Sequence, residues 1–137
     1  MDPRPLDRSF RVDNDSVDLA RFGGHLRRLG TPFVSRLFTR REVDAATHHA
    51  VDVVAALGAC LALKKAVARS IGDDTRIPLT DIEARWEFGA WNDVTLHGEA
   101  ARAAERCGRS VADIATLRTG SMANASVIVR AERQRVA

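Results

Sequence analysis

Basic side chains suit an acidic or phosphorylated partner, and the chain has arginine pairs at 27–28 and 40–41 as well as an apolar segment with Lys64, Lys65 and Arg69. Lys65 and Arg69 are four residues apart, so a helix would place them on one face, together with Leu61. The whole chain has the same bias, because 21 Lys and Arg against 18 Asp and Glu give a net charge of +3. A solvated helix surface is the other role that fits these residues, and the pattern alone leaves both interpretations open.

Asp15 belongs to the polar run 13–16 (DNDS), which is typical of a turn. Judged locally, its side chain suits an Asx turn or a helix cap. His48 and His49 invite a metal hypothesis, but neighbouring side chains on a helix point about 100° apart. We therefore expect the two histidines to be structural or exposed rather than a metal-binding pair.

Apolar periodicity predicts that helices carry these side chains. The longest signal runs from about Ala50 to Ile71, where apolar residues recur at steps of three and four, and Gly72 is expected to end it. Thr39 and Glu42 have the spacing of a capping box, so another helix should begin directly after Thr39. Shorter helices are expected at about 17–29, ended by Gly30 and Pro32, and at about 98–107.

Alternating patterns predict the strands. Residues 82–88 alternate apolar and charged side chains, as a half-buried strand does, and further strands are expected at about 10–12, 94–96, 113–118 and 125–131. Helices come mostly before strands, with no βαβ alternation, so we predict an α+β fold in which a small antiparallel sheet packs on the long helix. Residues 1–9 are expected to be a loose tail and residues 10–137 a single domain.

Composition argues against two classes of partner. No apolar run approaches the roughly 20 residues that a membrane span needs, and Met1 to Arg11 is too polar for a signal peptide, so we expect a cytoplasmic protein without membrane contact. The chain has no Tyr and no basic run interleaved with aromatic residues, so we expect no nucleic-acid binding.

Five segments in the same order resemble motifs of the holo-acyl-carrier-protein synthase family of phosphopantetheinyl transferases. Residues 61–72 (LALKKAVARSIG) resemble F-A-A-K-E-A-x-x-K-A-L-G. The other segments are 15–22 (DSVDLARF), 37–43 (LFTRREV), 81–83 (DIE) and 94–100 (VTLHGEA). The resemblance covers roughly residues 11–130 and implies a phosphopantetheinyl-transferase-like fold, assembled as a homotrimer with active sites between neighbouring subunits. It also implies coenzyme A as substrate or ligand and an acyl carrier protein as partner.

The resemblance also assigns roles to individual residues. Asp15 takes the position of a metal-binding Asp, normally a ligand of Mg²⁺, whereas Lys65 stands where the family has the second metal-binding carboxylate. A protonated ammonium cannot ligate a cation, so Lys65 argues against a bound metal and is expected instead to pair with Asp15. The resemblance implies cofactor binding by Lys64, Arg69 and Thr119, partner binding by Arg21 and Arg28, and loss of a family histidine at Gly120.

Three functions therefore stay open. The chain can be a phosphopantetheinyl transferase with an altered metal site. It can use the same fold for acid–base chemistry on an acyl group carried by a carrier protein or coenzyme A, with Asp15 and a buried Lys65 exchanging a proton, since burial disfavours a charged lysine. It can also be a non-catalytic protein that binds an acyl carrier protein.

Overall fold

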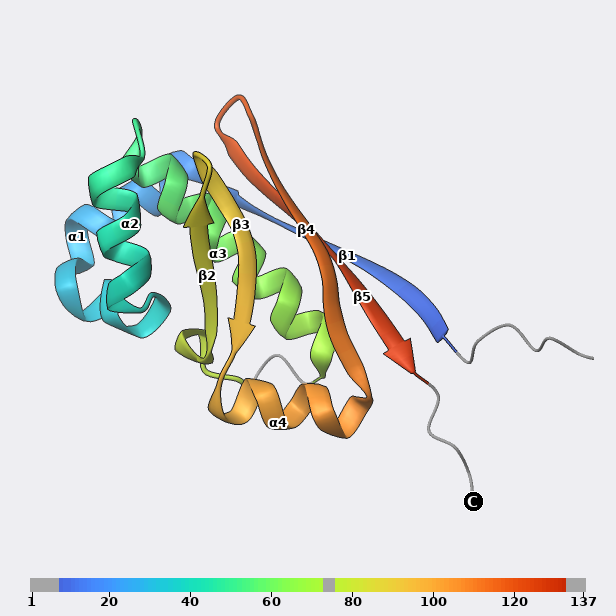
Figure 1. Ribbon diagram of the computed structural model, residues 1–137. Helices are drawn as coiled ribbons and strands as arrows, with labels where there is room; N and C mark the ends of the chain where they lie inside the picture. Colours follow the sequence, from blue (N-terminus) through green and yellow to red (C-terminus); the bar gives the residue numbers. More distant parts are fainter. Residues whose placement is uncertain (1–7, 73–75, 133–137) are drawn as a thin grey trace, which may run out of the picture.

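The computed structural model describes residues 8–72 and 76–132, and it confirms the predicted α+β class (Figure 1). The elements in chain order are β1 (Arg8–Asp18), α1 (Leu19–Leu37), α2 (Arg40–His49), α3 (Val53–Ile71), the short 3-10 helix η1 (Leu79–Asp81), β2 (Ile82–Glu87), β3 (Ala90–Leu96), α4 (Gly98–Cys107), β4 (Arg109–Thr119) and β5 (Met122–Glu132). The described strands form two small antiparallel sheets where one was predicted: a three-stranded sheet in the order β1-β5-β4, and the hairpin β2-β3.

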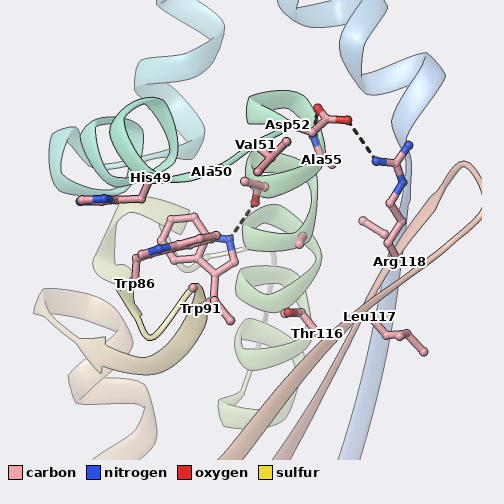
Figure 2. A pocket seen from close by; sticks show the side chains of 15 residues that line it. His49, Ala50, Val51, Asp52, Ala55, Trp86, Trp91, Thr116, Leu117 and Arg118 are labelled. Carbon is pink, nitrogen blue, oxygen red and sulfur yellow. Dashed lines mark hydrogen bonds and ion pairs between the residues drawn. The ribbon is translucent and has the colours of Figure 1, made fainter.

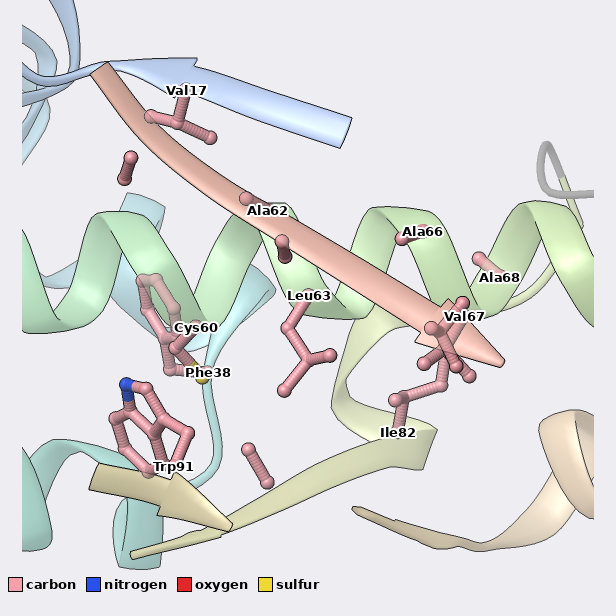
Figure 3. Packing of buried hydrophobic residues seen from close by; sticks show 14 of the residues in the cluster. Val17, Phe38, Cys60, Ala62, Leu63, Ala66, Val67, Ala68, Ile82 and Trp91 are labelled. Atoms are coloured by element: carbon pink, nitrogen blue, oxygen red, sulfur yellow. The ribbon is translucent and has the colours of Figure 1, made fainter. Parts of the chain in front are cut away.

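Helix α3 is the centre of the molecule and lies between the three-stranded sheet and the β2–β3 hairpin (Figure 1). Because both sides are covered, 12 of its 19 residues are buried. Leu63, Val67 and Ile82 meet in this core, and alanines such as Ala62 and Ala66 let the sheet approach the helix closely (Figure 3). Despite this apolar character, no helix within the described ranges is both long and apolar enough to cross a membrane.

Strand β1 is longer than predicted, and the expected turn at residues 13–16 is wrong. The whole run pairs with β5, with Asp13 opposite Val127 and Asp15 opposite Ala125. Backbone pairing over 11 residues outweighs the local turn preference of Asp and Asn. The strand begins at Arg8, inside the expected tail, whose residues 1–7 lie outside the described part of the chain.

Helix α1 also differs from its predicted end. Gly30 has φ of 66° and breaks the helix locally, but the chain resumes helical geometry, with Pro32 inside it, and continues to Leu37. The capping box that starts α2 is present as predicted, because the Thr39 hydroxyl accepts from the Glu42 amide and the Glu42 carboxylate accepts from the Thr39 amide.

Glu42 does more than cap α2, since its side chain is fully buried beside the equally buried Lys64. The Lys64 ammonium donates to Glu42 Oε1 at 2.5 Å, and the amide of Ala84 in β2 donates to Oε2 at 2.7 Å. The Cys60 thiol also faces this carboxylate at 3.5 Å, and burial, followed by the nearby negative charge, raises the pKa of Cys60 well above its usual value. One carboxylate therefore joins α2, α3 and β2.

We predict that Glu42→Gln lowers the free energy of unfolding by about 3–5 kcal/mol, because it leaves the buried Lys64 ammonium without its counter-charge. Urea denaturation measures the change. The exposed pair Arg40–Asp44 offers a matched control, and Asp44→Asn should lower the same free energy by less than about 1 kcal/mol. Adding Lys64→Met to Glu42→Gln should recover part of the loss. An unfolding midpoint of Glu42→Gln equal to that of the unchanged protein would contradict this role.

Candidate functional site

The structure brings together three of the predicted site residues, Asp15, Lys65 and Arg69. The Lys65 ammonium lies 3.3 Å from Asp15 Oδ1, and the Arg69 guanidinium lies 2.7 Å from Asp15 Oδ2. Asp15 Oδ1 also accepts a hydrogen bond from the amide of Ser16 at 2.8 Å. The Asp15 side chain is 10% exposed, whereas Lys65 and Arg69 are 42% and 46% exposed. The site thus presents two cations to solvent, with their common carboxylate behind them.

Contacts between β1 and the last turns of α3 hold this arrangement in place. Arg69 donates to the backbone carbonyl of Asn14 at 3.0 Å, and the Ser70 hydroxyl donates to Asp13 Oδ2 at 2.9 Å. Asp13 also accepts from the Arg11 guanidinium at 2.7 Å. The Arg11 hydrogen bond is the main reason why the pKa of Asp13 lies below its usual value; burial opposes the shift and the Ser70 hydroxyl adds to it.

A cavity of about 350 Å³ opens beside the three charged side chains. Its remaining lining is apolar and comes from α1, α3 and η1: Phe33, Leu37, Leu61, Ala68 and Leu79. We call this cavity the Asp15 cleft. Its combination of two exposed cations with an apolar wall suits a ligand that has an anionic group next to an uncharged chain.

The residues of the Asp15 cleft do not fit the divalent cation that the family resemblance implies. A hard cation such as Mg²⁺ needs several oxygen ligands, usually carboxylates. Here each oxygen of Asp15 faces a basic side chain, and position 65 offers an ammonium. Across residues 8–72 and 76–132, no group of three or more His, Cys, Asp or Glu side chains is arranged to hold a metal ion.

The other predicted site residues lie elsewhere. Lys64 is fully buried and its ammonium is bound to Glu42, so within the subunit it is not available to a phosphate in the Asp15 cleft. Thr119 ends β4 and does not line that cleft; its hydroxyl accepts from Asn124 at 3.4 Å. Arg21 and Arg28 are exposed on α1, seven residues apart and therefore on the same face.

A second cavity, of about 450 Å³, was not predicted from the sequence (Figure 2). Trp86 and Trp91 form one wall, with their rings edge to face and 5.0 Å apart. Trp91 is anchored, because its indole N–H donates to the carbonyl of Ala56 at 2.8 Å. On the other side Arg118 bonds to Asp52 at 3.0 Å. We call this cavity the tryptophan pocket.

The sequence contained little that could have revealed the tryptophan pocket. Its lining combines residues 49–52 at the end of α2 and after it, the start of α3, the β2–β3 hairpin, the end of β4 and Ala123 of β5. Asp52 and Arg118 are 66 positions apart, and nothing local marks them as partners. The two tryptophans were the available signal, but hairpin packing explains a tryptophan equally well, and the ring of Trp91 does pack in the core (Figure 3).

The fold is that of solved holo-acyl-carrier-protein synthases. The apo structure from Chronobacterium ammoniagenes superposes with a TM-score of 0.75 at 24% identity, covering 92% of this chain and 99% of that one. The coenzyme A complex from the same organism gives 0.72 at 20% identity, covering 91% and 99%. The enzyme from Neisseria meningitidis gives 0.71 at 22% identity, covering 86% and 95%.

Sequence comparison identifies the family to which the chain belongs. No family model matches the chain. A curated holo-[acyl-carrier-protein] synthase from Koribacter versatilis (strain Ellin345) is 31% identical over 117 residues, which are 84% of this chain and 93% of the relative. The chain therefore belongs to the holo-[acyl-carrier-protein] synthase family and is a phosphopantetheinyl-transferase-like protein.

The lowered pKa of Asp13 leads to a prediction about acid stability. A carboxylate with a lower pKa in the folded state stabilises the fold above its unfolded pKa, about 3.9 for Asp, and this stabilisation is lost as the pH falls through the folded value. Asp13→Asn should therefore be less stable than the unchanged protein at pH 7, and the difference should shrink as the pH falls below about 4. Urea midpoints between pH 7 and pH 2 measure it, with Asp93→Asn in the exposed hairpin as control. A difference that stays constant over this range would contradict the prediction.

Proposed function

We propose that this chain is a diverged holo-acyl-carrier-protein synthase that acts on coenzyme A, an acyl carrier protein, or both. The Asp15 cleft carries this proposal, because Lys65 and Arg69 expose two cations beside an apolar wall. Coenzyme A has the matching chemistry, a diphosphate joined to a long, largely uncharged pantetheine arm. Relatives of similar fold have been solved as coenzyme A complexes, which supports the same ligand here.

The reaction proposed is transfer of 4′-phosphopantetheine to a serine of the carrier protein. The serine hydroxyl oxygen forms a bond to the phosphorus next to the pantetheine arm and its proton passes to water, while the bond from that phosphorus to the bridging oxygen breaks and adenosine 3′,5′-bisphosphate leaves. Lys65 and Arg69 would bind the diphosphate oxygens and stabilise the charge that gathers on the leaving group. Asp15 would hold both cations in position, since each of its oxygens faces one of them. A Mg²⁺ ion is not part of this proposal.

The carrier protein would dock on α1. The family resemblance assigns Arg21 and Arg28 to partner binding, and both are exposed on one face of this helix. Two guanidinium groups one helical repeat apart suit an acidic helix of the partner, since opposite charges steer association. Helix α1 also contributes Phe33 and Leu37 to the Asp15 cleft, which would bring a docked carrier protein next to the cleft.

A non-catalytic carrier-binding protein is the second candidate, and the charge change at Lys65 favours it. The family's second metal-binding carboxylate is replaced by an ammonium, and Asp15 already has two basic partners. The acid–base alternative has less support, because it required a buried lysine and the side chain of Lys65 is 42% exposed.

Incubation with apo-carrier protein and coenzyme A tests the transferase proposal. The product should be heavier by one phosphopantetheine arm, measured by intact-protein mass spectrometry. Arg69→Met should slow its formation by about 100-fold or more, because one cation at the diphosphate is lost. Arg102→Met is the control, since this exposed arginine lies on α4, and it should leave the rate unchanged. If no product forms with or without Mg²⁺ while carrier protein and coenzyme A still bind, the chain is the non-catalytic binder.

We also propose that the chain assembles as a homotrimer with active sites between neighbours. The outer face of the three-stranded sheet supports this, because it leaves large apolar side chains in solvent. Phe10 is 62% exposed, Val12 58% and Leu117 68%, and the strand register puts all three on the side away from α3. The strands β1 and β4 are also sheet edges within the subunit, and an exposed edge with apolar side chains is usually covered.

A shared active site would give the tryptophan pocket a function. Its aromatic wall suits a nucleotide base, and the Arg118 guanidinium suits a phosphate. In this proposal, the tryptophan pocket of one subunit and the Asp15 cleft of the next hold the two ends of one coenzyme A molecule.

Sedimentation equilibrium tests the assembly. The mass should be about 45 kDa, three times the 15.0 kDa of the chain. Val12→Lys places a charge on the outer face of the sheet and should shift the mass toward one subunit. Thr47→Lys, at an exposed position on α2, is a control that should leave the mass unchanged. A single-subunit mass for the unchanged protein at micromolar concentration would overturn the proposal.

A further inference from the structure

The net charge of the Asp15 cleft determines whether it can attract an anionic ligand without a metal ion. One carboxylate and two basic side chains leave the cluster of Asp15, Lys65 and Arg69 with a single net positive charge. A carboxylate at position 65 would make the same cluster negative by one charge, and a bound divalent cation would bring it back to one positive charge. Lys65 therefore gives the cluster, without a metal, the net charge that a carboxylate and a divalent cation would give it together.

The geometry leaves both cations able to reach a ligand. The Asp15 carboxylate is mostly covered, so an approaching anion meets Lys65 and Arg69 before the negative charge behind them. Arg69 uses one N–H on the Asn14 carbonyl and one on Asp15, out of five on a guanidinium. The Lys65 ammonium has three donors, and its contact with Asp15 at 3.3 Å is a loose ion pair.

The backbone position of Lys65 is fixed by the contacts of α3 with β1. The Ser70 hydroxyl bound to Asp13 and the Arg69 guanidinium bound to the Asn14 carbonyl hold the last turns of α3 against β1. The base of the Lys65 side chain consequently lies beside Asp15 before any ligand arrives, within reach of the 3.3 Å ion pair.

We propose that the Asp15 cleft binds the diphosphate of its ligand without a divalent cation, with the Lys65 ammonium supplying the positive charge that a metal would otherwise bring. The inference rests on the proposed function, because coenzyme A is the ligand that supplies the diphosphate.

Isothermal titration with coenzyme A, in a chelating buffer and in a Mg²⁺ buffer, tests the inference. The unchanged protein should bind with dissociation constants that agree within about twofold. Lys65→Glu should bind at least about 10-fold more weakly in chelator, because the cluster becomes negative, and Mg²⁺ should restore much of the affinity. Lys65→Met should bind weakly in both buffers, because it supplies neither a cation nor a metal ligand. Arg102→Glu repeats a charge reversal away from the cleft and should leave both dissociation constants unchanged.

Electron paramagnetic resonance with Mn²⁺ gives a second readout that does not depend on coenzyme A. Lys65→Glu should bind Mn²⁺ and the unchanged protein should not. Binding of coenzyme A by the unchanged protein only in Mg²⁺ buffer, or binding of Mn²⁺ beside an intact Lys65, overturns the metal-free site and leaves the proposed function standing. Absence of coenzyme A binding in either buffer overturns the proposed function itself, and the inference with it.

Discussion

The buried contact between the Glu42 carboxylate and the Lys64 ammonium is the interaction on which the arrangement of α2, α3 and β2 depends. Neither charge has access to water, so each relies on the other, and the Glu42 carboxylate also accepts hydrogen bonds from two backbone amides. Those amides belong to the first residue before α2 and to the middle of β2. The pair therefore fixes the rotation of α3 about its axis as well as its distance from the neighbouring elements.

That rotation decides where the functional side chains lie. Consecutive residues on a helix point about 100° apart, so a Lys64 directed at Glu42 sends Lys65 toward a different neighbour. That neighbour is β1, where alternation along the strand places Asp13 and Asp15 on the face that looks at α3. Phe10 and Val12 consequently lie on the opposite face. One strand thus supplies the carboxylate of the site on one side and an apolar surface on the other.

The sequence predicted those features that depend on short-range spacing. The capping box of Thr39 and Glu42 and the long helix that contains Lys64 and Lys65 follow from residues within a few turns of one another, and both are confirmed. The proximity of Asp15 and Lys65 could be expected from the family resemblance alone, because 50 residues separate them. The ion pair between Glu42 and Lys64 and the burial of both side chains could not be predicted, since they depend on contacts between α2, α3 and β2. The same holds for the tryptophan pocket, whose lining comes from segments that meet only in the folded chain.

Adjacent positions on α3 therefore have separate tasks, since Lys64 pairs with Glu42 in the core and Lys65 pairs with Asp15 at the cleft. Lys64 cannot change alone without leaving a buried carboxylate unpaired. Lys65 is 42% exposed at the edge of the cleft, so a substitution there alters the electric field of the cleft more than the packing of the core. The electric field of the Asp15 cleft depends on three charged side chains, Asp15, Lys65 and Arg69.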